Sequence, residues 1–435
     1  MLTKERILKI SPIALAVVAG VCACVATGVG NANFVDSADY LAAAKMLVEQ
    51  GRYPDVSTLP FFRAPLYPGF ISLIWLIVPG SIVAIKAVQV VIFAATAWVI
   101  GRTAKAIAKN EWAAFAAGAM FAVNPFFAFE AAAIQTECLQ IFLLAAAFYF
   151  TVRMLLASEL KLWNALPLGV LLGLAALNKP SALGACVVLA LVIWFFKRRV
   201  ANSIIVPVGV VAAGLLTILP WSLFVYRTKG EFFLVNDAGG YNLWSGNLPA
   251  SVEYYQTTFA SSADASAWGE DHPGTQIAEW ESTVGYSKLT LQQREELWSS
   301  KAIENMSAQP ATIAKLWGYK FLSYWKPFVS SSIYSPLAVA ASAAIMIPLF
   351  VLGFLGVSST LRGAETSPVG WMFIAVAVFA TVVHVVIVSN LRLRLPYIDP
   401  LLTVFAGISV CELAAKFFRK LRPREGMLTY AAAAF

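Results

Sequence analysis

Long apolar runs, separated by short polar segments, dominate the chain from end to end. A membrane-spanning helix needs about 20 apolar residues, and about ten runs reach or approach that length. They lie at residues 8–30, 81–101, 112–129, 134–157, 163–178, 180–196, 202–225, 334–357, 368–388 and 396–415. The pattern therefore predicts an all-α polytopic membrane protein with about ten transmembrane helices.

A shorter apolar run at residues 66–79 decides the topology. Its roughly 14 residues lie between Pro65 and Pro79, which is too short to cross a bilayer comfortably, so we expect an interfacial or re-entrant helix. Without this crossing, the basic clusters fall on the side of the N-terminus, as the positive-inside rule requires. These clusters are Arg102, Lys105 and Lys109; Arg153 and Lys161; Lys197 to Arg199; Arg362; and the tail from Lys416 to Arg424. We therefore expect a multi-pass protein of a plasma (bacterial inner) membrane with both termini in the cytoplasm.

Two polar loops and one short turn then face the extracytoplasmic, or periplasmic, side. They are residues 31–80, residues 226–333 and residues 390–396. Apolar residues at near-helical spacing between residues 290 and 326 predict amphipathic juxtamembrane helices in the larger loop. We divide the chain into an N-terminal transmembrane module with the first outer loop (1–225), the large loop (226–333), and the C-terminal transmembrane helices with the tail (334–435).

Composition supports the membrane class and narrows the partners. Hydrophobic residues make up 59% of the chain and charged residues only 13%, whereas soluble domains carry roughly a quarter charged residues. The mean hydropathy is +0.72. The formal charge of +8 arises from Lys and Arg at the ends of apolar runs, which favours a lipid bilayer and not nucleic acid as the partner.

Acidic residues of the first outer loop are the first candidates for chemistry. Asp36 precedes a helical pattern that Gly51 closes, so its simplest interpretation is a helix N-cap, which is compatible with a role as catalytic base. Asp39 either shares a divalent cation with Asp36 or is a solvated acid favoured by the helix dipole. A metal site at these two residues is thus left open.

Further candidates lie at the outer ends of the apolar runs. Glu137 is an acid at membrane depth, where a charge is costly, so it is a functional candidate unless water reaches it. Four outward-facing cations run against the positive-inside bias: Arg63, Lys179, Arg392 and Arg394. Together they suit an anion such as a lipid phosphate, although snorkelling explains each of them singly. His272 and His384 have no spacing typical of a zinc or Ser/His mechanism.

The order of these features resembles the GT-C class of membrane glycosyltransferases. More narrowly it is similar to family 39, which includes the protein O-mannosyltransferases and the aminoarabinose transferases of lipid A. The resemblance begins with Asp36 four residues before Tyr40 and continues with the Gly-x-Tyr of Gly51 and Tyr53. Arg63, before Pro65 and Pro68 at the entry to the membrane, completes the first part of the pattern.

The pattern then extends along most of the chain. Its later members are Glu137 in QTECLQIF, Lys179 in GLAALNKP, Asn247 in YNLWSGNLP, and Arg392 and Arg394 in RLRLP. Two positions depart from it. Ser37 stands where a second acid is usual, which weakens a metal site, and Lys179 replaces a common Arg.

The resemblance implies a GT-C-like fold and transfer of a sugar from a polyprenyl-phosphate donor to an extracytoplasmic glycan, lipid or protein. For a single inverting displacement, we assign Asp36 as general base and Arg63, Lys179, Arg392 and Arg394 to the donor phosphate. Asp39, Tyr40, Glu137 and Asn247 are further site candidates. No cofactor is required, and a divalent cation stays open.

Two other functions fit part of the same pattern. An O-antigen-type polymerase or ligase also uses a polyprenyl-linked substrate and a basic outer site, and the early Asp36 loop favours the sugar transferase over it. A transporter or flippase of lipid-linked substrates favours midplane charges and two related halves, neither of which the sequence displays.

Overall fold

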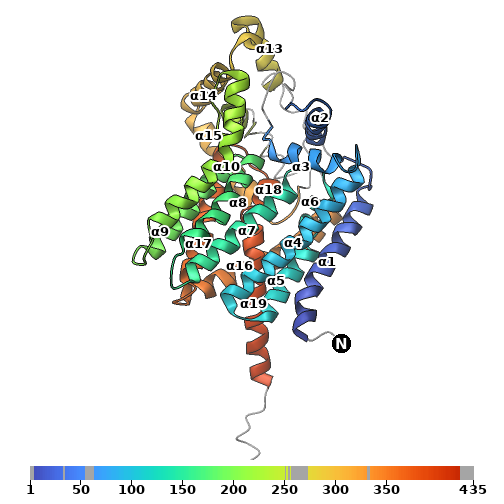
Figure 1. Ribbon diagram of the computed structural model, residues 1–435, viewed down its shortest axis with the longest axis vertical. Coiled ribbons are helices and arrows are strands. Elements are labelled where there is room, and N and C mark those ends of the chain that lie inside the picture. Colours follow the sequence, from blue (N-terminus) through green and yellow to red (C-terminus); the bar gives the residue numbers. More distant parts are fainter. Residues whose placement is uncertain are drawn as a thin grey trace, which may run out of the picture.

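The computed structural model describes residues 4–32, 35–53, 63–249, 251–252, 255, 273–330 and 334–421, and these form helices and turns without a strand. The molecule is elongated (Figure 1), with α2, α13, α14 and α15 gathered at one end and α19 projecting from the other. We call these the loop end and the tail end. His272, Arg422 and Arg424 lie outside the described residues.

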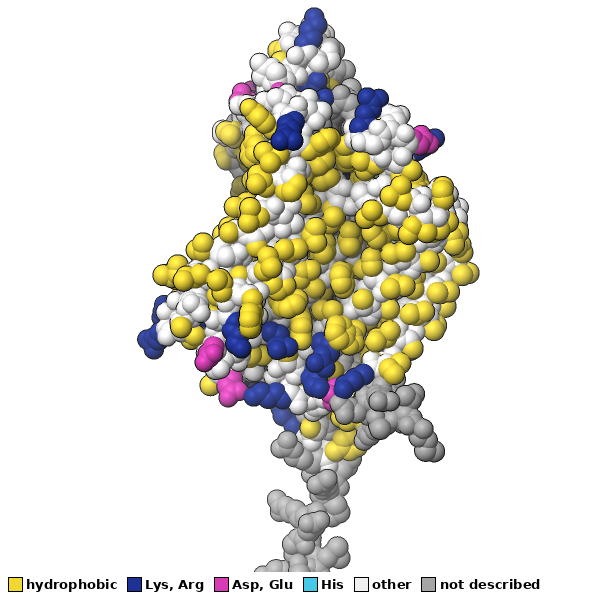
Figure 2. All heavy atoms as spheres, viewed as in Figure 1, with side chains coloured by type: hydrophobic (Ala, Val, Ile, Leu, Met, Phe, Trp, Pro, Cys, Tyr) yellow, Lys and Arg dark blue, Asp and Glu magenta, His cyan; other side chains and the backbone are white. Residues whose placement is uncertain are grey.

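Apolar helices build the body of the molecule, and they follow the predicted runs. They are α1 (Lys4–Ala26), α4 (Ile82–Ala108), α5 (Glu111–Val123), α6 (Pro125–Ala132), α7 (Glu137–Leu156), α8 (Ala165–Asn178), α9 (Ala182–Lys197), α10 (Ile205–Lys229), α16 (Pro336–Arg362), α17 (Ser367–Val386) and α19 (Asp399–Leu421). Hydrophobic side chains cover the face of the body seen in Figure 2, between two ends where charged side chains appear. The prediction of an all-α polytopic membrane fold is confirmed.

Fewer than ten of the described helices are both long enough and apolar enough to cross a membrane. Seven described helices are long and apolar enough to cross a membrane, or eight if the bent pair α5 and α6 is one span. This pair bends by 57°, where Pro125 begins α6 and the Asn124 side chain accepts the Phe126 N–H at 3.0 Å. The predicted runs at 163–178 and 180–196 form α8 and α9, whose 14 and 16 residues are shorter than a usual span.

Small residues allow the helices of the body to pack closely. A Cβ on Gly169 of α8 would lie 2.4 Å from the Val210 carbonyl oxygen of α10, and one on Gly356 of α16 would lie 2.1 Å from the Phe405 carbonyl oxygen of α19. Such close backbone approach is typical of membrane helix pairs, which gain their stability from van der Waals packing. A larger side chain at either glycine would force the two helices of the pair apart.

Shorter helices lie outside the long spans. They are α2 (Val35–Gln50), α3 (Leu66–Trp75), η1 (Leu162–Asn164), α11 (Gly239–Gly246), α13 (Pro273–Val284), η3 (Tyr286–Lys288), α14 (Leu291–Ala308), α15 (Pro310–Trp325) and α18 (Leu391–Arg394). The ten residues of α3 agree with the prediction that residues 66–79 do not span. The helices predicted between residues 290 and 326 are confirmed as α14 and α15, and Thr290 and Gln293 form a capping box at the start of α14.

The helices of the large loop have a small core of their own. Trp244 of α11 and Trp298 of α14 are fully buried, and Trp280 and Tyr286 pack with them. Aromatic side chains bury a large apolar area, so a few of them stabilise a small unit. Asn247, at the end of α11, ties this unit to the body, because its amide nitrogen donates to the Val386 carbonyl of α17 at 2.7 Å.

Candidate active site

Six charged side chains from distant parts of the sequence meet at the loop end of the bundle. They are Asp36 and Asp39 of α2, Arg63 just before α3, Glu137 at the start of α7, Lys179 just after α8, and Arg392 of α18. We call these six residues the charge cluster. Three carboxylates face three cations, so the cluster is electrically balanced.

Arg63 joins the two acids of α2. Its Nη2 lies 2.9 Å from Asp36 Oδ1 and 2.8 Å from Asp39 Oδ2, and its Nε lies 3.1 Å from Asp39 Oδ2. Residues three apart share one face of a helix, which is why both carboxylates reach one guanidinium. Asp36 lies within the first turn of α2 and its oxygens accept from arginine, so the interpretation of Asp36 as a helix N-cap is wrong.

Glu137 is the most buried member of the charge cluster. Its side chain has no exposed surface, and its Oε1 accepts from Lys179 Nζ at 2.6 Å and from Arg392 Nε. Arg392 also reaches Asp36 Oδ2 with Nη2 at 3.3 Å and Nη1 at 3.4 Å. Burial by itself lowers the pKa of Arg392, but the attraction of Glu137 and neighbouring carboxylates more than offsets this and raises the pKa above its usual value. Arg392 therefore stays charged while it bridges two acids.

Tyrosine side chains position Arg63. The guanidinium lies over the ring of Tyr40, 5.5 Å from the ring centre, and Tyr40 itself packs edge-on against Tyr67 with ring centres 5.1 Å apart. Burial raises the pKa of Tyr40 to about 12, so the hydroxyl stays neutral. Tyr53, just beyond Gly51, donates from its hydroxyl to the Arg63 carbonyl at 2.9 Å. The Gly51 to Tyr53 segment thereby fixes the backbone that carries Arg63.

The charge cluster does not fit a divalent cation. Asp36 and Asp39 both accept hydrogen bonds from Arg63, whose guanidinium lies where the two carboxylates converge. In the described part of the chain, no group of three or more His, Cys, Asp or Glu side chains is placed to hold a metal ion. The two acids of α2 thus form an ion-pair network with arginine.

Two of the predicted site residues lie elsewhere. Arg394 is fully buried and forms a two-pronged ion pair with Asp399, with N–O distances of 2.8 and 3.1 Å. Its Nη1 donates to the carbonyls of Tyr324 and Lys326, so the expectation that Arg394 joins the phosphate-binding cations does not match its place. Asn247 is also buried, and it links α11, α15 and α17 through the Val386 carbonyl and the Trp317 indole. Both side chains hold the loop-end helices together.

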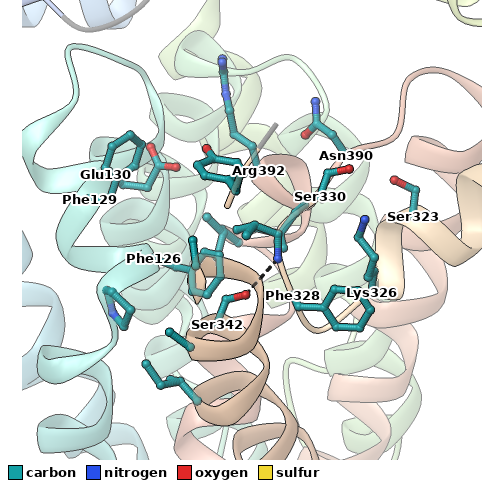
Figure 3. Close-up of a pocket in the computed structure, with 18 of the residues that line it drawn as sticks. Phe126, Phe129, Glu130, Ser323, Lys326, Phe328, Ser330, Ser342, Asn390 and Arg392 are labelled. Carbon is teal, nitrogen blue, oxygen red and sulfur yellow. Dashed lines mark hydrogen bonds between the residues drawn. The ribbon is translucent and has the colours of Figure 1, made fainter. Parts of the chain in front are cut away.

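An apolar cavity opens beside the charge cluster. It has a volume of about 550 Å³ and lies between α6 on one side and the ends of α15, α16 and α18 on the other. Figure 3 shows Phe126, Phe129 and Phe328 around it, with Arg392 and Glu130 at one side. Arg392 therefore belongs both to the cavity wall and to the charge cluster.

Two residues of this wall, Glu130 and Gln135, were not among the predicted site residues. Glu130 Oε2 is buried and has no hydrogen-bond partner among the described residues, and the same is true of Gln135 Oε1 and Nε2. Buried polar atoms are rarely left unpaired, so these atoms mark a place for a polar ligand or ordered water. Glu130 is an acid inside the apolar segment PFFAFEAA. An acid at membrane depth is costly, and this reason, which made Glu137 a functional candidate, also makes Glu130 one.

Comparison with solved structures defines the class of fold. The oligosaccharyltransferase AglB from Archaeoglobus fulgidus, solved with an inhibitory peptide and a dolichol-phosphate, aligns over 98% of this chain and 53% of its own, with a TM-score of 0.56 and 12% identity. The apo form of the oligosaccharyltransferase from that organism aligns over 96% and 52%, with a TM-score of 0.59 and 12% identity. This chain spans about half the length of these proteins. Its described helices have the GT-C fold of membrane glycosyltransferases.

The family comparison confirms the resemblance seen in the sequence. Residues 62–224 match the family described as dolichyl-phosphate-mannose-protein mannosyltransferase. This segment contains Arg63, Glu137 and Lys179. ArnT from Cupriavidus metallidurans, solved with undecaprenyl phosphate, aligns over 95% of this chain and 81% of its own, with a TM-score of 0.42 and 14% identity. No curated protein matches the chain by sequence.

Proposed function

We propose that this chain is a glycosyltransferase that moves a sugar from a polyprenyl-phosphate carrier to an acceptor at the loop end, by a single inverting displacement. The family match over residues 62–224 and the GT-C fold support the class of reaction. The dolichol-phosphate in the AglB structure supports a lipid carrier of this kind.

The observation that carries the proposal is the double role of Arg392. This side chain lines an apolar cavity and also bonds to Glu137 and Asp36. A lipid whose first isoprene units occupy the cavity would bring its phosphate to Arg392, where the guanidinium fork suits phosphate oxygens. The unpaired polar atoms of Glu130 and Gln135 beside it suit the hydroxyl groups of a bound sugar.

The chemistry requires a base and a stabilised leaving group. The acceptor hydroxyl oxygen attacks the anomeric carbon, the bond from that carbon to the phosphate oxygen breaks, and its electron pair stays with the phosphate. Asp36, which is 31% exposed, takes the hydroxyl proton as general base. Arg63, Lys179 and Arg392 stabilise the negative charge that grows on the phosphate.

The geometry of Arg392 supports a coupling between donor binding and catalysis. Its contacts with Asp36, at 3.3 and 3.4 Å, are the longest of the charge cluster, whereas Lys179 lies 2.6 Å from Glu137. A donor phosphate that draws Arg392 away breaks these weak contacts first. Asp36 then loses one of its two cations and becomes a better proton acceptor when the donor is in place.

The charges also support an orientation. Figure 2 has Lys and Arg side chains gathered around the tail end of the body, and the positive-inside rule favours the cytoplasm for such an end. We therefore place the loop end, with the charge cluster, on the extracytoplasmic side of the plasma membrane and both termini in the cytoplasm.

Replacement of Asp36 by Asn tests the proposal. In a reconstituted assay with a polyprenyl-phosphate sugar, we expect Asp36→Asn to lower turnover by about 10²–10⁴-fold, the usual contribution of a general base. Asp39→Asn is the matched control, because Asp39 accepts hydrogen bonds from Arg63, whereas Asp36 contacts both Arg63 and Arg392. We expect the loss of turnover in Asp39→Asn to stay below about tenfold. Both variants should insert and melt like the parent.

The result that contradicts the proposal is turnover in Asp36→Asn within a few-fold of the parent. The same assay separates the other functions. Release of sugar from a diphosphate lipid but not from a monophosphate lipid would favour a polymerase or ligase, and passage of the intact lipid across vesicles without bond cleavage would favour a flippase.

A further inference from the structure

A second cavity lies at the tail end, far along the helices from the charge cluster. Its volume is about 760 Å³, within the usual range of ligand pockets, which is roughly 300–1,000 Å³. It forms where α4 and α7 end and where residues 157–164 lead from α7 to α8. Its charged lining residues are Arg102, Lys105, Lys109, Arg153, Glu159 and Lys161.

Two of the five lining cations are already neutralised. Lys105 forms an ion pair with Glu111, and Lys109 Nζ lies 3.0 Å from Glu365 Oε2. The cavity contains one acid of its own, Glu159. A positive excess therefore remains, and it resides on Arg102, Arg153 and Lys161.

Arg102, Arg153 and Lys161 contact aromatic rings in place of carboxylates. None of them forms an ion pair within the described part of the chain, and each lies over an aromatic ring. The distances to the ring centres are 6.0 Å for Arg102 over Trp98, 5.9 Å for Arg153 over Tyr149 and 5.6 Å for Lys161 over Trp163. A cation held by a ring face keeps its charge and most of its hydrogen-bond donors for an incoming anion.

Exposed aromatic residues place the cavity at the surface of the bilayer. Trp98 is 47% exposed and Trp163 is 73% exposed, and tryptophan gathers at the depth of lipid headgroups. Leu162, next to Trp163 in the sequence, is 55% exposed, and Leu166, three residues further on, is 62% exposed. Their side chains offer apolar contact to acyl chains beside a cavity lined by cations.

We infer that this tail-end cavity binds the phosphate-bearing headgroup of an anionic phospholipid. The positive-inside bias accounts for basic residues at this end of the helices, but it does not require that they line one cavity. Basic pockets between membrane helices recognise lipid headgroups in this manner, and the arginine fork suits phosphate oxygens. Since a soluble phosphate ester presents the same group, the experiment compares the two sources. The site is independent of the proposed sugar transfer.

Native mass spectrometry of the purified full chain tests the inference with three probes: phosphatidylglycerol, phosphatidylcholine and glycerol 3-phosphate. We expect phosphatidylglycerol to bind on the order of 100-fold more tightly than phosphatidylcholine, because three cations contribute, and at least about tenfold more tightly than glycerol 3-phosphate. Each surface cation contributes roughly fivefold to anionic lipid binding, so Arg102→Gln/Lys161→Gln should lower this affinity about 25-fold. Binding of phosphatidylcholine should not change.

Arg198→Gln is the matched control. Arg198 follows α9 and lies over the Phe195 ring at 4.9 Å, but it does not line the cavity, so phosphatidylglycerol affinity should stay within twofold of the parent. An equal loss in this control would overturn the inference in favour of general charge attraction. Equal binding of phosphatidylcholine would overturn it too, and equal binding of glycerol 3-phosphate would assign the cavity to a soluble ester.

A single variant keeps the test valid if the double variant unfolds. Arg153 is exposed, and its donated hydrogen bond goes to the Tyr149 hydroxyl at 3.1 Å. The fold should therefore tolerate Arg153→Gln, with the melting temperature as the check. We expect a roughly fivefold loss of phosphatidylglycerol affinity, and an unchanged affinity in this folded variant would overturn the inference.

Discussion

Replacing Glu137 by Gln removes one negative charge from the most buried point of the charge cluster and keeps the size of the side chain. Glu137 has no exposed surface, and its Oε1 accepts from both Lys179 and Arg392. Removing one partner of a buried ion pair costs about 3–5 kcal/mol, because the other charge stays buried without compensation.

The expected cost of Glu137→Gln in unfolding free energy lies at or slightly below the lower end of that range. Lys179 is 15% exposed and Arg392 is 32% exposed, so water screens both stranded cations. Arg392 also keeps its contact with Asp36 at 3.3 Å. We expect a loss of about 2–3 kcal/mol in the free energy of unfolding, which for a chain of 435 residues corresponds to a fall of roughly 2–3 °C in the melting temperature.

Thermal unfolding of the purified protein in detergent measures this change. Glu304→Gln is the control, since Glu304 pairs with Lys301 at the surface with 64% of its side chain exposed, and exposed pairs contribute about 0–1 kcal/mol. A second substitution sharpens the test. Lys179→Met in the Glu137→Gln background removes a stranded cation, so the double variant should recover part of the lost stability.

Two results would refute this reasoning. One is a Glu137→Gln protein that melts like the parent, which would mean that the two cations do not depend on this carboxylate. The other is a double variant whose losses simply add, because independent losses imply that Lys179 and Glu137 do not interact in the folded protein.

Three further predictions concern Arg394, Lys320 and Gln135. Arg394→Met should cost about 3–5 kcal/mol of unfolding free energy by leaving Asp399 unpaired, and adding Asp399→Leu should restore part of it, because the Tyr324 and Lys326 carbonyls still lose their donor. Burial lowers the pKa of Lys320 to about 7. Above pH 7 this lysine has lost its proton in the folded protein but keeps it in the unfolded chain, so the melting temperature should rise from pH 6 to pH 9. Lys320→Met should flatten this rise. Gln135→Leu should raise the melting temperature by removing unpaired buried atoms, yet weaken binding of a polyprenyl-phosphate sugar roughly tenfold, as titration would measure.

Much of the scaffold was predictable because a membrane helix satisfies its own backbone hydrogen bonds. Length and apolarity of a segment then decide its structure, and the predicted runs do form helices. The number of full spans was overestimated, because α8 and α9 have only 14 and 16 residues and because the apolar run at 112–129 is divided into α5 and α6 by a bend at Pro125. Local signals also located the end of α2, since Gly51 adopts the positive φ of 65° that follows the helix.

The charges of the candidate site were predicted by residue, but their partners were not. Arg63, Glu137, Lys179 and Arg392 were selected because a charge at the outer rim is costly or unusual, and Asp36 because of its place before Tyr40 in the first outer loop. Arg392 and Glu137 are separated by 255 positions in the sequence, and no linear spacing indicates that they bond. Glu130 was missed, although its place in an apolar segment carries the same signal as that of Glu137.

Arg392 and Arg394 show what the sequence determined and what only the tertiary structure decided. The sequence alone identified RLRLP as a basic turn at the outer rim, and on that basis the two arginines were equivalent. Folding made this segment the short helix α18, where residues two positions apart point about 200° away from each other. Arg392 therefore faces the charge cluster and the cavity, whereas Arg394 is buried against Asp399. Composition and spacing determined which charges lie at the rim, and the packing of the helices decided which of them meet.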